Sequence, residues 1–228
     1  MPLFENERTM SLKKQLLMLP LIAVAATGCV ESDSPIVILN RLVMSDTCTV
    51  VENVYRPSGS LNLSAGMGYP AFFDIESNMQ GLSTDVDGEV VAGPDQNDFI
   101  SERIDITYSS PSGAAVPAAV TVPYYAAIRA GAPSGDNSIV VDLLPQAARV
   151  ALAGVGAQGA TIMAEFQMHG RLRSGRAISS NTVSYPIQVY EAPVPTCPFG
   201  YLGTGECGSM GGQDGAPIVC ADDPSATP

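Results

Sequence analysis

The stretch that decides the fold is residues 160–170, which read ATIMAEFQMHG. Its apolar side chains fall on one face of an extended chain: Ile162, Ala164, Phe166 and Met168. A period of two predicts a strand with one buried face. A glycine-containing turn region at 172–176 and a second alternating stretch at 180–191 complete a predicted hairpin.

The same pattern along the chain predicts about eight or nine short strands. The other predicted strands are 36–44, 48–55, 60–64, 71–79, 99–109, 116–125 and 138–144. One short helix is predicted over 146–153, with Pro145 at its first position and Gly154 beyond its end. Short strands separated by turns indicate an all-β protein, specifically an antiparallel β-sandwich of immunoglobulin-like or fibronectin-like architecture.

The composition limits the classes of partner. The 228 residues carry a net charge of −12 and contain no tryptophan, and both lysines lie near the N-terminus, at Lys13 and Lys14. Such a charge argues against binding to nucleic acid, whose phosphates require a basic surface. It also argues against electrostatic docking on anionic lipid. The length suffices for one sizeable hydrophobic core.

Four cysteines beyond Cys29 form an even set: Cys48, Cys197, Cys207 and Cys220. We expect two disulfides, because a zinc site would favour a closely spaced cysteine pair and the chain has a single histidine, His169. Four cysteines allow three pairings. The spacing favours Cys207 with Cys220 and Cys48 with Cys197, which would staple the Gly- and Pro-rich tail.

The N-terminal segment carries a targeting pattern. Residues 16–29 read LLMLPLIAVAATGC and follow the two lysines. The apolar run is shorter than the roughly 20 residues that span a bilayer. Ala26 and Gly28 are the small residues that a cleavage site before a cysteine requires. This segment resembles the signal peptide of a bacterial lipoprotein, with either Met1 or Met10 as the start.

The resemblance covers only the first 29 residues, and it implies cleavage before Cys29 and a lipid on that cysteine. The predicted organisation is a signal peptide at 1–28, a tether at 29–35, a β-sandwich at 36–192 and a Cys/Gly/Pro-rich tail at 193–228. Val30 follows the cysteine where an acidic residue would indicate retention in the inner membrane. We therefore expect a cell-envelope location at the outer membrane.

Catalytic motifs are not recognisable in the sequence. A serine nucleophile would need a base, and His169 falls on the face of its strand opposite to Phe166. Without a nucleophile elbow or a phosphate-binding glycine loop, we expect a protein that is not an enzyme.

An acidic segment is the best candidate for a metal site. Asp85, Asp87 and Glu89 surround a glycine turn, with Asp95 and Asp98 downstream. Calcium prefers such oxygen ligands. Alignment to an EF-hand loop places Pro94 where the bidentate acid belongs, so a solvated acidic loop is the competing interpretation.

Three arginines beside the predicted turn, Arg171, Arg173 and Arg176, form a candidate surface for an acidic partner or a lipid headgroup. We expect a non-enzymatic, lipid-anchored envelope protein that binds other proteins or serves as an accessory subunit of a membrane-associated assembly. The alternative is a module that binds a small ligand, a carbohydrate or calcium through residues 85–98.

Overall fold

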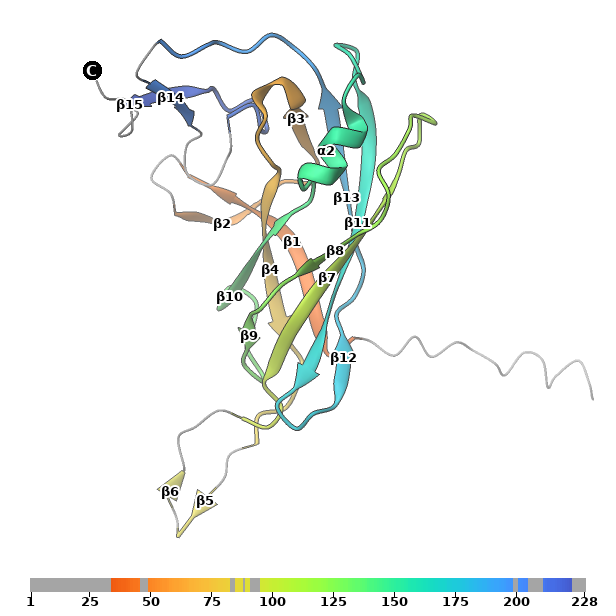
Figure 1. Ribbon diagram of the computed structural model, residues 1–228. Coiled ribbons are helices and arrows are strands. Elements are labelled where there is room, and N and C mark those ends of the chain that lie inside the picture. The colour runs from red at the N-terminus through yellow and green to blue at the C-terminus, as the bar shows by residue number, and fades with distance from the viewer. Residues whose placement is uncertain are drawn as a thin grey trace, which may run out of the picture. The chain divides into compact units, whose positions relative to one another are not determined.

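The alternating stretch forms β11 (Ala160–Leu172), a central strand of the larger of two sheets (Figure 1). The computed structural model describes residues 34–45, 49–82, 85–87, 89–90, 95–198, 201–204 and 211–222. Along β11 buried and less buried residues alternate, as the sequence predicts. The predicted strand face is therefore confirmed.

The larger sheet has seven strands, and β11 pairs with neighbours on both of its edges. Its main order is β3 (Gly59–Asn62), β13 (Val183–Tyr190), β11, β7 (Phe99–Ser109) and β8 (Val120–Pro123). Two short strands extend it: β12 (Ala177–Ser179) on β11 and β9 (Ala127–Ile128) on β7. These strands pair antiparallel except for β3, which runs parallel to β13.

The smaller main sheet has four strands. Its order is β10 (Asn137–Asp142), β4 (Pro70–Ser77), β1 (Ile36–Met44) and β2 (Val50–Tyr55). A bulge between Ile38 and Arg41 shifts the register of β1 against β4. Because side chains alternate along a strand, the bulge turns Arg41 to the buried face that Ile38 also occupies.

Two hairpins and two helical turns complete the described chain. The hairpins are β5 (Asp85–Val86) with β6 (Glu89–Val90), and β14 (Tyr201–Thr204) with β15 (Val219–Asp222). The helical elements are the 3-10 turn η1 (Leu63–Ala65) and the helix α2 (Gln146–Leu152). The predicted short helix is confirmed, although Pro145 is its N-cap residue and not its first position.

Side chains from both main sheets share one hydrophobic core. At its centre, Phe73 of β4 and Phe166 of β11 meet with ring centroids 4.8 Å apart. Tyr185 of β13 meets Phe73 edge to face at 5.9 Å. Burying such side chains contributes roughly 1.5–3 kcal/mol each. The fold is thus mostly β and β-sandwich-like, as predicted, with one disulfide, between Cys197 and Cys220, in the described chain.

Strands β9 and β12 were not anticipated, because two or three residues are too few to show a period. No helix within the described ranges is long and apolar enough to cross a membrane. The predicted boundaries at residues 28, 35 and 192 stay predictions.

Candidate functional site

The most elaborate polar site in the described chain surrounds the carboxylate of Asp214. Arg41 Nη2 lies 2.6 Å from Asp214 Oδ2, and Arg56 Nη1 lies 3.4 Å from the same oxygen. The Tyr69 hydroxyl and the backbone N–H of Ser60 each donate to Oδ1 at 2.9 Å. Both carboxylate oxygens are therefore bound, and the side chain of Asp214 is only 5% exposed.

Aromatic side chains hold Arg41 in place. Its Nη1 donates to the Tyr185 hydroxyl at 2.9 Å. The guanidinium carbon lies 5.1 Å from the ring centroid of Tyr69 and 5.5 Å from that of Tyr185, within cation–π range. We call Arg41, Arg56, Ser60, Tyr69 and Tyr185 the socket.

Burial and charge set the protonation states in the socket. Burial raises the pKa of Tyr69 and of Tyr185, so both hydroxyls stay protonated and can donate. Burial alone would lower the pKa of Arg41, but Tyr69 and Asp214 outweigh it and raise that pKa. The socket is thus a cationic receptor for one carboxylate.

The socket is filled by a glycine-rich segment of the tail, residues 211–216, which we call the strap. Asp214 has a φ of 55°, and Gly212 and Gly215 have φ values of 84° and 79°. These left-handed conformations favour glycine and, among other residues, aspartate and asparagine. The sequence places GGQDG at 211–215, so the local chemistry suits the observed turn.

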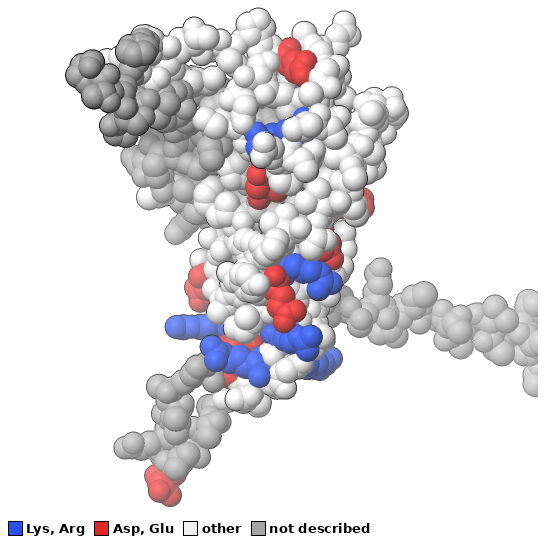
Figure 2. All heavy atoms as spheres, viewed as in Figure 1, with Lys and Arg blue, Asp and Glu red and all other residues white. Residues whose placement is uncertain are grey.

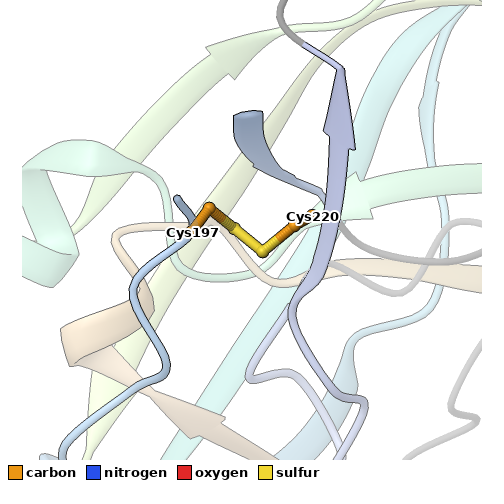
Figure 3. The surroundings of a disulfide bond; sticks show 2 residues. All are labelled: Cys197 and Cys220. Carbon is orange, nitrogen blue, oxygen red and sulfur yellow. A yellow bond between two sulfur atoms is a disulfide. The ribbon is translucent and has the colours of Figure 1, made fainter. Parts of the chain in front are cut away.

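The disulfide joins Cys197 to Cys220 of β15, with their Cα atoms 5.5 Å apart (Figure 3). The predicted pairings of Cys207 with Cys220 and of Cys48 with Cys197 are therefore wrong. Sequence spacing suggested them, whereas pairing of β15 with β14 decides where Cys220 lies. Because both bonded cysteines belong to the tail, the disulfide closes the tail on itself.

Cys29, Cys48 and Cys207 lie outside the described residues. Of the three pairings that four cysteines allow, the one that contains the observed bond joins Cys48 to Cys207. We therefore predict that any second disulfide links these two residues.

His169 contacts two polar side chains on the outer face of the larger sheet, opposite to Phe166 as predicted. Its Nε2 lies 3.1 Å from Asp105 Oδ2 and its Nδ1 lies 2.8 Å from Ser179 Oγ. Since a carboxylate only accepts, a neutral His169 donates from Nε2 and accepts from Ser179. These cross-strand contacts could not be predicted, because their residues are far apart in the sequence.

Burial alone would raise the pKa of Asp105, but hydrogen bonds from Thr121 and Arg103 together outweigh burial and lower that pKa. The Asp105 side chain is 36% exposed, so water reaches it. Asp105, His169 and Ser179 contact one another in the order found in a nucleophilic triad. A catalytic triad, however, acts in an enclosed site beside an oxyanion hole. We assign the cluster to cross-strand pairing.

The acidic segment is described in part. Asp95 and Asp98 each bind backbone N–H groups through both carboxylate oxygens: the donors are Asn97 and Leu82 for Asp95, and Ala130 and Asp95 for Asp98. Asp87 lies exposed in the turn between β5 and β6. The side chains of Asp85 and Glu89 lie outside the described part.

Within the part of the chain that the structure covers, no group of three or more His, Cys, Asp or Glu side chains could hold a metal ion. The carboxylates of Asp95 and Asp98 shape their own loop. Calcium binding by residues 85–98 stays a prediction that calorimetric titration with millimolar calcium would test.

Of the three arginines, Arg171 lies near the end of β11, and Arg173 and Arg176 lie in the turn between β11 and β12. Arg171 pairs with Glu102 at 3.0 Å, and Arg173 pairs with Asp98 at 3.7 Å. Figure 2 shows basic and acidic side chains interleaved on the face in view. An exposed pair such as Arg171 with Glu102 contributes about 0–1 kcal/mol. Binding of an acidic partner or a lipid headgroup by the surface of Arg171, Arg173 and Arg176 stays a prediction.

An open cavity of about 300 Å³ lies beside α2 and η1, and its lining includes Leu63, Arg149, Val150 and Glu191. Arg149 Nη1 donates to the carbonyl of Gly66, and Glu191 Oε1 accepts the N–H of Gly154 at 2.7 Å. Both charged groups thus bind backbone, and we assign no ligand to this cavity.

Comparison of the chain with protein-family models, curated proteins and solved structures finds no match.

Proposed function

We propose that the chain is a non-enzymatic, lipid-anchored protein of the bacterial cell envelope that binds other proteins as an accessory subunit of a membrane-associated assembly. The observation that carries this proposal is the apolar stretch that ends at Cys29, shortly before the folded unit begins at Ser34. Four residues, 30–33, would then separate the lipidated cysteine from the folded unit. A fully extended chain of that length spans only about 14 Å. The anchor would hold the sandwich close to the membrane surface.

The bond between Cys197 and Cys220 supports an exported location, because disulfides persist in oxidising compartments and are rare in the cytosol. We further propose the outer membrane, from the valine that follows Cys29.

We propose an immunoglobulin-like topology for the sandwich. In such domains strands A, B and E share one sheet, and strands G, F, C and C′ share the other. The orders β1-β4-β10 and β13-β11-β7-β8 follow the same scheme. Phe73 and Phe166 then lie on strands B and F, the two strands that a disulfide links in antibody domains.

Protein binding is the activity that this architecture supports best. Immunoglobulin-like sandwiches display loops at their ends, and their edge strands can pair with a partner's strand. The two main sheets end at β10 and β2 and at β3 and β8. Within the described residues, β3 carries one isolated bridge to Gln213 on its outer side, and β2, β10 and β8 each pair with a strand on one side only. A binding role needs no catalytic group.

The lipid anchor is tested by expressing the full chain and a Cys29→Ala variant in a bacterial host. We expect the wild-type protein to partition into detergent and to yield an N-terminal peptide whose mass includes acyl chains at Cys29. The Cys29→Ala protein should keep its signal segment and lack that mass. An unmodified Cys29 in membrane-extracted protein would refute the anchor.

A further inference from the structure

The strap lies along an edge of β3 that no strand of the sheet covers. Gln213 forms an antiparallel bridge with Leu61 of β3. The N–H of Asn62 donates to the carbonyl of Gly212 at 2.9 Å, and the N–H of Asp214 donates to that of Ser60 at 2.8 Å. The strap therefore binds β3 as an added strand would, through main-chain hydrogen bonds.

Side chains add sequence preference to these backbone contacts. Gln213 is fully buried, and its side-chain amide donates to the carbonyl of Pro70 at 2.8 Å. Asp214 enters the socket, where two guanidinium groups, a hydroxyl and a backbone N–H surround it. A carboxylate that binds arginine makes shorter and stronger hydrogen bonds than a neutral acceptor. The site thus binds a glutamine followed by an aspartate.

The socket is built by residues outside the strap. Arg41 is held by Tyr185 and by the faces of two aromatic rings, all from the sandwich. Gly59 leaves room for Tyr69, because a Cβ at position 59 would lie 1.6 Å from the Tyr69 hydroxyl oxygen. Two arginines face one carboxylate, so removing Asp214 would leave an excess of positive charge. A positively charged site held in place by the sandwich is suited to bind the carboxylate of another segment.

The strap itself is held by few backbone contacts to the sheet. It forms one isolated bridge and no continuous ladder. Three of its residues adopt left-handed conformations, and one of them, Asp214, is not glycine. The conformation is unstrained at the two glycines and carries a cost only at Asp214, and non-glycine residues of this kind gather at switch regions and ligand clamps.

We propose that the β3 edge and the socket form a recognition site for a segment of a partner protein that carries an aspartate in a glycine-flanked turn, and that the strap occupies this site until the partner displaces it. The inference rests on the proposed protein-binding function and names its surface. The strap competes at the effective concentration of a tethered ligand, which for short linkers is in the millimolar range. A partner's segment must therefore bind more tightly than the strap does.

The test uses a full-chain variant in which the strap is released and the socket is intact. Gly212→Val serves this purpose, because position 212 has a φ of 84° and a Cβ there would lie 2.8 Å from the Cβ of Ala65. Gly154→Val is the matched control, since Gly154 is also left-handed, at 92°, but borders open space. The probe is a fluorescent peptide with the sequence of residues 211–217, GGQDGAP, and the readout is fluorescence anisotropy.

We expect the peptide to bind Gly212→Val at least tenfold more tightly than it binds wild type or Gly154→Val. A peptide with asparagine in place of aspartate should bind Gly212→Val at least tenfold more weakly. Adding Arg56→Gln to Gly212→Val should weaken binding of the aspartate peptide severalfold.

Equal binding to wild type and to a folded Gly212→Val, or equal binding of the aspartate and asparagine peptides, would overturn the proposal. If Gly212→Val does not fold, Asp214→Ala replaces it with the same probes. Failure of both variants to fold would also contradict the proposal, because an exchangeable strap must be dispensable for folding. The lipid at Cys29 and the copurification of a partner are measured in separate experiments, so the proposed function can stand when this inference fails.

Discussion

Replacing Phe73 with alanine removes the centre of the contact between the two sheets. Phe73 is 1% exposed and packs against Phe166 and Tyr185, which come from two strands of the other sheet. Its neighbour Phe72 is only half-buried and points to the opposite face of β4. The adjacent phenylalanines therefore provide a test and a matched control on one strand.

The expected loss follows from the volume removed and the contacts broken. Burial of a phenylalanine and the cavity left behind together make Phe→Ala cost about 3–5 kcal/mol of unfolding free energy. Tilted aromatic pairs such as Phe73 with Phe166 contribute part of that, about 0.5–1.5 kcal/mol. We expect about 1 kcal/mol for Phe72→Ala, because its ring keeps partial contact with water.

Urea denaturation followed by circular dichroism measures both variants. With a slope of roughly 2 kcal/mol per molar urea, the midpoint of Phe73→Ala should fall by about 1.5–2.5 M. The midpoint of Phe72→Ala should fall by about 0.5 M. Equal losses, or a larger loss for Phe72→Ala, would refute the assignment of the buried face of β4 and with it the contact between the sheets.

Three further outcomes test other parts of the structure. A non-reducing peptide map should contain a peptide in which Cys197 is joined to Cys220, and a map that joins Cys207 to Cys220 would contradict the tail structure. Loss of this disulfide in Cys220→Ser should lower the unfolding free energy by about 2–4 kcal/mol. Gly59→Ala should cost about 1–3 kcal/mol, because its Cβ would overlap the hydroxyl of the buried Tyr69 side chain. Gly68→Ala should cost less, because its Cβ would meet only the end of the exposed Asp142 side chain. The pKa of Asp105 is lower in the folded protein than the ordinary carboxyl value of about 3.9. Ionised Asp105 therefore stabilises the fold at pH values above about 3.9, and this contribution is lost as the pH falls through the lowered pKa. Asp105→Asn should therefore narrow the stability difference between pH 7 and pH 3 in denaturant titrations, and an unchanged difference would exclude that contribution.

The long strands could be predicted because each has one buried face. Residues 99–109 and 160–170 show a period of two, and the structure has strands over Phe99–Ser109 and Ala160–Leu172. The parallel pairing of β3 with β13 could not be predicted in this way, because the two strands are far apart in sequence. Short pairings such as β9 on β7 depend on neighbours that the local sequence does not specify.

The socket was missed for a related reason. Asp214 lies in a glycine-rich segment that reads as an ordinary turn, and nothing near it in sequence indicates two arginines from β1 and the end of β2. The one available signal was Arg41, a charged residue inside the apolar stretch 36–44. A buried arginine requires a partner, but the sequence could not say which of many carboxylates it was.

The central claim, a lipid-anchored subunit that binds other proteins, is tested most directly by affinity capture. The full chain, tagged after residue 228, is extracted from native membranes in mild detergent, and quantitative mass spectrometry measures what is recovered with it. We expect a partner protein in a fixed molar ratio to the captured chain. Recovery of the chain alone, with its lipid intact, would contradict the binding role.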